Sequence, residues 1–116
     1  MGWNNLNSVS ALEQISTAST EKPQLVFKHS TRCSISSAAK HRLEADLDKL
    51  GAEFDLHFLD LILHRDVSNE IASRFGIMHQ SPQVIVLRNG QPVFDMSHYD
   101  ILPADILSQL KSTEKG

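Results

Sequence analysis

The stretch that decides the fold is Leu25-Val26-Phe27-Lys28-His29-Ser30-Thr31-Arg32-Cys33-Ser34-Ile35-Ser36. Its first three residues form a short apolar run between a proline and two hydroxyl residues, which predicts a buried strand. After Cys33, apolar side chains recur at helical spacing from Ile35 to Leu50, and Gly51 is expected to end this helix. The stretch therefore predicts a strand that leads into a long helix, with a cysteine at the junction.

Further elements are predicted on both sides of this junction. A capping box formed by Ser10 and Glu13 predicts a short N-terminal helical extension over about 8–17. The elements expected downstream are a strand at 54–61, a helix begun by Asp66 and ended by Gly76, a strand at 84–87, a turn at Asn89-Gly90, a returning strand from Val93 and a helix begun by Pro103. The element order is therefore α-β-α-β-α-β-β-α.

The connections between the strands predict how the sheet is built. A long helix joins the first two strands, which should therefore be parallel with a right-handed crossover. A tight turn joins the last two strands, which should be antiparallel. We therefore expect one α/β domain spanning residues 1–116, with a four-stranded mixed sheet and helices on both of its faces.

Composition excludes several classes of protein. The 116 residues are 41% hydrophobic, which is enough for a folded domain with a core. Eleven Lys and Arg against fourteen Asp and Glu give a net charge of −3, which argues against nucleic acid as a partner. No apolar run approaches the roughly 20 residues of a membrane helix and no signal peptide is recognisable, so we expect a cytoplasmic protein without a membrane partner.

Cys33 is the single cysteine, so it cannot form an intramolecular disulfide. At the start of a helix, unpaired N–H groups and the positive end of the helix dipole stabilise a thiolate, and Arg32 adds a cation. The alternative is a small core residue, but the polar neighbours Arg32, Ser34 and Ser36 favour a reactive thiol. We therefore expect Cys33 to be a nucleophile, and no ligand spacing around it predicts a metal site.

Ser36 lies three residues after Cys33, where dithiol oxidoreductases have a second cysteine that resolves mixed disulfides. A serine cannot resolve a disulfide, but from one helical turn away it can donate a hydrogen bond to the Cys33 thiolate. The alternative role is that of an ordinary residue on the helix surface. The spacing therefore predicts a monothiol mechanism, in which an external thiol resolves the intermediate.

Several blocks of the sequence carry a family resemblance. They are Phe27–Ser36, Arg65–Asn69, Ser81-Pro82-Gln83, Asn89-Gly90 and His98–Ile101, together with Trp3-Asn4 and Leu6. With the element order, they resemble the thioredoxin superfamily and, more closely, the monothiol bacilliredoxins. The most specific part is Lys28-His29-Ser30-Thr31-Arg32-Cys33, whereas Ser34 departs from the proline that the family usually has after the cysteine.

The resemblance implies a thioredoxin-like fold and an enzyme, a monothiol thiol–disulfide oxidoreductase. In such a protein Cys33 attacks the bacillithiol sulfur of an S-bacillithiolated client protein, and a second bacillithiol then regenerates Cys33. The implied partners are these clients and bacillithiol as co-substrate, with no tightly bound cofactor. Ser81-Pro82 is implied to face Cys33, where a cis bond would present the Ser81 backbone to the thiol ligand; the alternative for Pro82 is an ordinary edge device before a strand.

Further residues are candidates for holding bacillithiol, which carries glucosamine and malate groups. Lys28 and Arg32 are candidates to supply positive charge, and His98 and Asp100 to hold the polar end of the ligand. His29 is a candidate to tune Cys33. The alternatives are solvated charges for Lys28 and Arg32, a polar turn and helix cap for His98 and Asp100, and simple packing for His29.

Two other functions stay open from the sequence. The first is an iron–sulfur carrier like the monothiol glutaredoxins, although Cys33-Ser34-Ile35-Ser36 departs from their usual Cys-Gly-Phe-Ser. The second is a redox-inert thioredoxin-like binding module, in which Cys33 would react slowly with alkylating reagents. The colour of the purified protein tests the first function, and the alkylation rate of Cys33 tests the second.

Overall fold

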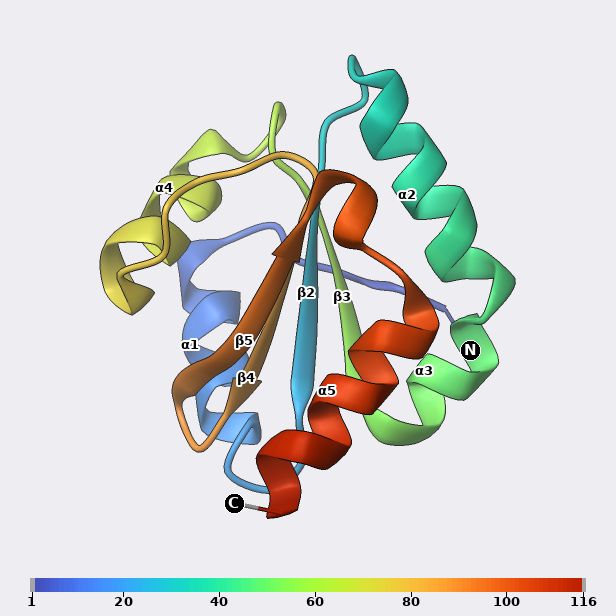
Figure 1. The fold of residues 1–116 in the computed structure, drawn as a ribbon. Coiled ribbons are helices and arrows are strands. Elements are labelled where there is room, and N and C mark those ends of the chain that lie inside the picture. Colours follow the sequence, from blue (N-terminus) through green and yellow to red (C-terminus); the bar gives the residue numbers. More distant parts are fainter. Residues whose placement is uncertain (1, 116) are drawn as a thin grey trace.

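A five-stranded mixed sheet forms the centre of the fold, which a computed structural model describes for residues 2–115 (Figure 1). Its strands are β1 (Asn4–Asn5), β2 (Gln24–His29), β3 (Asp55–Asp60), β4 (Gln83–Arg88) and β5 (Gln91–Ser97), in the spatial order β1-β3-β2-β4-β5. As expected from the connections, β2 and β3 are parallel, whereas β4 and β5 are antiparallel. The central strand β2 pairs with β3 on one side and β4 on the other.

The expectation of four strands is wrong, because β1 adds a fifth strand parallel to β3. Its two asparagines are exposed, so no apolar or alternating pattern marks them as a strand. The neighbouring residues hold β1 in place: Leu6 is buried and its N–H donates to the Phe58 carbonyl at 2.9 Å. The ring of Trp3 packs against Phe27 and Phe58.

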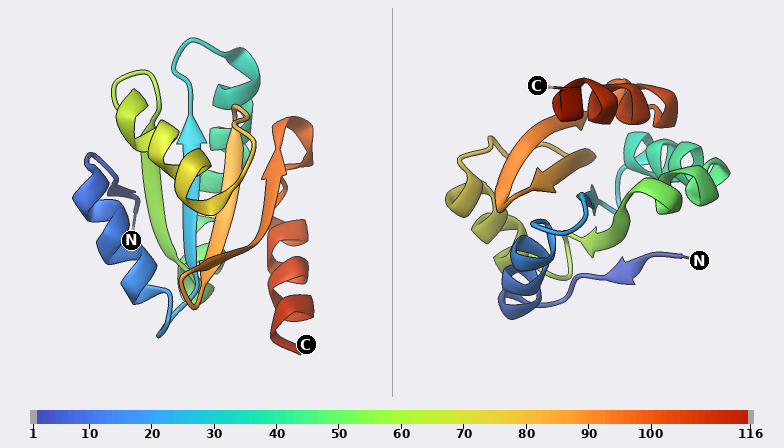
Figure 2. Two further views of the ribbon diagram at one scale, coloured as in Figure 1. Left: turned by 90° about the vertical axis from the view of Figure 1, so that its left-hand side faces the viewer. Right: turned by 90° about the horizontal axis from the view of Figure 1, so that it is seen from below.

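Helices cover both faces of the sheet (Figure 2). They are α1 (Val9–Ala18), α2 (Ser34–Ala45), α3 (Leu47–Glu53), α4 (Arg65–Phe75) and α5 (Pro103–Lys115), with a short 3-10 helix η1 (His98–Asp100) before α5. Leu25 and Phe27 of β2 pack against the α2, α3 and α5 side, whereas Val26 packs against the α1 and α4 side. Alternate residues of β2 therefore serve two separate cores.

The boundaries of three helices differ from those expected. The long helix breaks at Asp46 into α2 and α3, and Gly51 does not end it, because Leu50 and Gly51 are both buried inside α3, which continues to Glu53. Ser8 caps α1 in place of Ser10, accepting the Ala11 N–H at 3.1 Å. Asp66 lies in the first turn of α4, and His64 is the residue that precedes this helix.

Three local predictions are confirmed. Gly76 ends α4 in the left-handed conformation, with φ of +64°. Asn89 and Gly90 both have positive φ in the turn between β4 and β5, as a tight hairpin requires. Pro103 is the first residue of α5. Among the residues that the structure describes, no helix combines the length and apolar character needed to cross a membrane.

Candidate active site around Cys33

Cys33 lies at the predicted junction, after the end of β2 and directly before α2. Its N–H donates to the Ser30 carbonyl at 3.2 Å, and its own carbonyl accepts the Ser37 N–H at 3.1 Å. These two bonds close a tight turn over 30–33 and begin the helix. The free thiol is half-buried and makes no capping hydrogen bond to α2, so it stays available to a reaction partner.

Ser36 holds this turn from inside the protein. Its side chain is fully buried, and its Oγ accepts the Ser30 N–H at 3.0 Å and lies 2.7 Å from His29 Nδ1. The alternative of a helix-surface residue is therefore wrong. The expected hydrogen bond to Cys33 is not among its contacts, and Ser36 shapes the turn that carries the thiol.

His29 ends β2 and contacts the site through Ser36. Its imidazole is buried and packs against the rings of Phe27 and Phe58. Burial is the main cause that lowers the pKa of His29, and the charge of Lys40 adds to this, against smaller opposing effects of Asp60, Ser36 and Glu44. The imidazole is therefore neutral at neutral pH, and both packing and a hydrogen bond fix it behind the turn.

Arg32 is exposed beside Cys33, as the sequence suggested. Within residues 2–115 its guanidinium takes part in no salt bridge, so its charge is free to act on an incoming group.

Ser81-Pro82 precedes β4 and lies at the end of the sheet where β2 leads to Cys33. Lys28 pairs with Gln83 across β2 and β4, so Pro82 lies beyond the last paired residues, next to the end of β2 that leads to Cys33. The Ser81-Pro82 bond is cis. Ser81 Oγ is buried and has no hydrogen-bond partner within residues 2–115. A polar atom without a partner is thus present at this end of the sheet.

His98 and η1 border this part of the site. The His98 N–H donates to the Pro82 carbonyl at 3.1 Å, and His98 has a positive φ of 56°. Arg42 of α2 ties η1 down, since its guanidinium donates to the carbonyls of Ile101 and His98 at 3.0 and 3.3 Å. Asp100 is exposed on η1. The sequence analysis missed Arg42, whose position on a helix gives no sign of its carbonyl partners.

Lys28, a candidate to supply positive charge to the ligand, is buried, so the alternative of a solvated charge is wrong for it. It is only 1% exposed and follows Val26 on the α1 and α4 face of the sheet, opposite to α2. Its Nζ lies 2.7 Å from His79 Nδ1 and 3.0 Å from Gln83 Oε1. A lysine between apolar and polar residues is usually solvated, so no pattern in the sequence indicates this burial.

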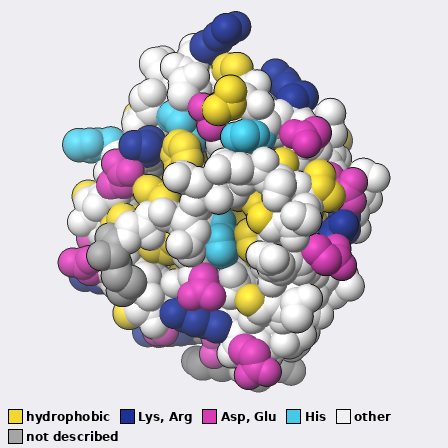
Figure 3. Space-filling model, turned by 180° about the vertical axis from the view of Figure 1, so that it is seen from behind, with side chains coloured by type: hydrophobic (Ala, Val, Ile, Leu, Met, Phe, Trp, Pro, Cys, Tyr) yellow, Lys and Arg dark blue, Asp and Glu magenta, His cyan; other side chains and the backbone are white. Residues whose placement is uncertain are grey.

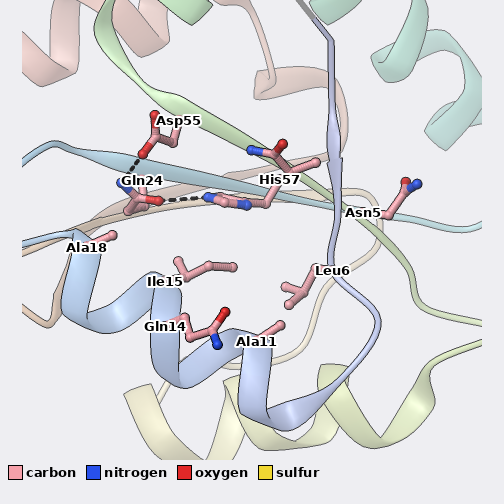
Figure 4. Close-up of a pocket in the computed structure, with 10 residues that line it drawn as sticks. Asn5, Leu6, Ala11, Gln14, Ile15, Ala18, Gln24, Asp55 and His57 are labelled. Carbon is pink, nitrogen blue, oxygen red and sulfur yellow. Dashed lines mark hydrogen bonds between the residues drawn. The ribbon is translucent and has the colours of Figure 1, made fainter.

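Two hollows differ in their relation to Cys33. One runs along α2 from the Cys33 turn, lined by Thr31, Ser37, Lys40 and the ring of Phe58 among others. The other, of about 270 Å³, lies between α1, β1 and β3 at the opposite ends of the parallel strands (Figure 4). The polar side chains that line this hollow bond one another, since Gln24 bonds His57 at 2.7 Å and Asp55 at 2.8 Å. Of these two hollows, the one along α2 includes a residue of the Cys33 turn, Thr31, in its lining.

The surface opposite to the view of Figure 1 carries Lys and Arg side chains interspersed with Asp and Glu (Figure 3). Several histidines lie on the upper half of this face. Within residues 2–115, no group of three or more His, Cys, Asp or Glu side chains has an arrangement that could hold a metal ion.

Comparison with solved structures identifies the class of protein. A proposed oxidoreductase with a thioredoxin fold superposes with a TM-score of 0.80 at 30% sequence identity, over 91% of each chain. Thioredoxin from Malassezia sympodialis (TM-score 0.73, 17% identity, 96% of this chain and 90% of that one) and thioredoxin from Trypanosoma brucei brucei (0.73, 16%, 99% and 93%) share the fold. The protein is thus a thioredoxin-fold chain of the oxidoreductase class.

The family follows from a match to the family described as monothiol bacilliredoxin BrxC, which covers residues 4–106. The chain belongs to the monothiol bacilliredoxin family. This confirms the family resemblance that the Cys33 block suggested, and the thioredoxin-like fold with it. Membership of this family supports a role of the chain in thiol–disulfide chemistry.

The contacts of Ser36 lead to a first prediction. Ser36→Ala removes the hydroxyl that pairs with Ser30 and His29, so we expect a loss of about 1–3 kcal/mol in the free energy of unfolding. Urea denaturation measures this loss. Ser37→Ala is the matched control, since Ser37 is exposed one position further on, and it should change stability by no more than about 0.5 kcal/mol. Equal stability of the two variants would contradict the structural role of Ser36.

The burial of Lys28 leads to a second prediction. Burial lowers the pKa of Lys28 from its ordinary value of 10.5 to about 8. Between these values the unfolded chain binds a proton that the folded protein does not, so the free energy of unfolding rises with pH. Wild type should therefore gain stability relative to Lys28→Met as the pH rises from 8 to 10.5, measured by urea denaturation at a series of pH values. A stability difference that stays flat or falls over this window would show that the ammonium is not buried as described.

Proposed function

We propose that the protein removes bacillithiol from S-bacillithiolated protein cysteines through a mixed disulfide on Cys33. One observation carries the proposal: a half-exposed thiol begins α2, while the position of a resolving cysteine holds the buried hydroxyl of Ser36. An intramolecular disulfide is therefore impossible, and the intermediate must be resolved by an external thiol. Membership of the monothiol bacilliredoxin family supports bacillithiol as that thiol.

The proposed cycle balances without a further oxidant or reductant. The Cys33 thiolate attacks the bacillithiol sulfur of the client's mixed disulfide, so a bond from Cys33 to bacillithiol forms while the bond to the client breaks. The client leaves as a thiolate and takes up a proton. A second bacillithiol thiolate then attacks the bacillithiol sulfur on Cys33, which releases bacillithiol disulfide and restores the Cys33 thiolate.

The residues around Cys33 have complementary roles in this proposal. Arg32 supplies a solvent-exposed cation next to the reacting sulfurs. The Ser81-Pro82 loop and the neighbouring His98 border the proposed path of an extended thiol ligand, which would pair with the Ser81 backbone. Asp100 lies on η1 at the edge of this region and, with His98, is a candidate to hold the polar end of the ligand.

The hollow along α2 offers a second place for the sugar and carboxylate groups of bacillithiol. Cys33 and Ser37 lie one helical turn apart, and Lys40 follows on the same side of α2. Hydroxyls at Thr31 and Ser37 suit a sugar, and the Lys40 ammonium, which lies 5.8 Å from the centre of the Phe58 ring, suits a carboxylate. In this proposal, either place receives only the part of the ligand beyond its sulfur.

The transfer of bacillithiol to Cys33 is the decisive prediction. Reduced protein is incubated with a bacillithiol-capped model protein, and both are weighed by intact mass spectrometry. We expect one bacillithiol to move to the wild type and none to Cys33→Ser, because Cys33 is the single cysteine of the chain. Transfer without dependence on Cys33 would contradict the mechanism.

The remaining outcomes of this experiment separate the other functions. If no bacillithiol moves although Cys33 is alkylated rapidly, the substrate is another small thiol or an iron–sulfur cluster, and the colour of the purified protein distinguishes these. If no bacillithiol moves and alkylation is slow, a redox-inert binding module is the better description.

The departure of Ser34 from the family proline leads to a further prediction. Ser34 is the first residue of α2 and Cys33 before it is extended, with φ of −118° and ψ of 121°, which is the conformation favoured before proline. Ser34→Pro should therefore fold normally and gain about 0.4–1 kcal/mol of stability. Thermal denaturation measures the gain, and Ser37→Pro, placed where the N–H bonds to Cys33, is the control that should lose stability. A loss in Ser34→Pro would mean that the turn differs from the one described.

A further inference from the structure

The loop over 76–82 joins α4 to β4 (Figure 1). Lys28 of β2 contacts His79 of this loop and Gln83 at the start of β4, and we call these three residues the Lys28 brace. Lys28 is among the largest fully buried side chains of the protein. Lysine is almost never fully buried unless it is paired, because removing an ammonium from water is costly. The hydrogen-bond partners of Lys28 therefore indicate which part of the structure this buried ammonium supports.

Gln83 bonds the backbone of this loop, and Lys28 bonds Gln83. Gln83 Oε1 accepts from Lys28 Nζ at 3.0 Å and from the Gln80 N–H at 3.3 Å. The other end of the same amide donates to the Met78 carbonyl at 3.2 Å. The Lys28 ammonium and the Gln80 N–H thus fix the orientation of the Gln83 amide. The amide in turn holds residues 78–80, which precede Ser81-Pro82.

His79 adds the second arm of the brace. A protonated lysine can only donate, so His79 Nδ1, at 2.7 Å, accepts from Lys28 and the ring must be neutral. Burial is the main cause that lowers the pKa of His79, and the charges of Lys28 and Arg65 lower it further. Ser68 of α4 lies 3.4 Å from the same nitrogen. Lys28, His79 and Arg65 are the titratable groups that these contacts bring together.

We propose that the Lys28 brace holds the Ser81-Pro82 loop in the position that accepts the mixed-disulfide substrate, so that Lys28 sets substrate affinity without touching the substrate. The inference rests on the proposed function, since it assigns the thiol ligand to this loop. Lys28 is then a positioning residue that acts through Gln83 and His79. The Cys33 turn lies on the other face of β2 and is held separately by Ser36, so losing the brace should leave the reactivity of Cys33 unchanged.

Lys28→Met tests the proposal, because methionine fills a similar volume without the ammonium. KM and kcat are measured for removal of bacillithiol from a capped model peptide, beside the rate of Cys33 alkylation by iodoacetamide. We expect KM to rise roughly tenfold, with kcat and the alkylation rate within about threefold of wild type. Lys111→Met, at an exposed position on α5, is the control and should match wild type.

Hydrogen–deuterium exchange of the same variants tests the brace without reference to any substrate. Exchange in the peptide that covers 77–83 should become faster in Lys28→Met, because the Gln80 N–H loses its fixed acceptor, while exchange in β2 stays the same. If the wild type removes no bacillithiol, the proposed function fails, and the exchange data still decide whether the brace exists.

Two results would overturn the proposal. One is an unchanged KM in a folded Lys28→Met, and the other is unchanged exchange over 77–83. Should Lys28→Met fail to fold, His79→Ala replaces it, because His79 is exposed and its loss leaves the core intact. His79→Ala should then raise KM and loop exchange in the same direction by a smaller factor, and no change in either would equally refute the brace.

Discussion

The candidate site depends on the pairing of one buried hydroxyl, that of Ser36, with the Ser30 N–H and with His29. Ser36 lies in the first turn of α2, Ser30 begins the turn, and His29 ends β2, so three successive pieces of backbone meet at one oxygen. Cys33 lies between these points and makes no capping bond of its own. Its position is therefore set by its neighbours, which leaves the sulfur free for chemistry.

The central strand β2 distributes the two halves of the site between its two faces. Phe27 and His29 point toward α2 and support the Cys33 turn, whereas Val26 and Lys28 point toward α4 and support the loop before β4. Because side chains alternate along a strand, one short segment supports both halves through different residues. A disturbance on one face therefore need not reach the other, so the Cys33 turn and the loop before β4 can be altered separately.

Those parts of the fold and of the candidate site that depend on short local patterns could be predicted from the sequence. The strand-to-helix junction at Cys33, the turn at Asn89-Gly90 and the end of α4 at Gly76 follow from short patterns with a direct steric cause. β1 could not be predicted, because two exposed asparagines carry no periodicity and their strand exists only through the anchoring of Leu6 beside them. The burial of Lys28 and the partners of Ser36 could not be predicted for a similar reason, because both depend on residues that only the folded chain brings close.

The monothiol character of the site is more than the lack of a second sulfur. In a dithiol enzyme the third residue after the nucleophile is a cysteine whose thiolate attacks the mixed disulfide. Here that position is fully buried and its hydroxyl already pairs with two groups that define the turn. Ser36 therefore has a structural task that a cysteine, a weaker hydrogen-bonding group, would perform less well. Ser36 thus fixes the turn that carries Cys33 from the very position where a dithiol enzyme has its second cysteine.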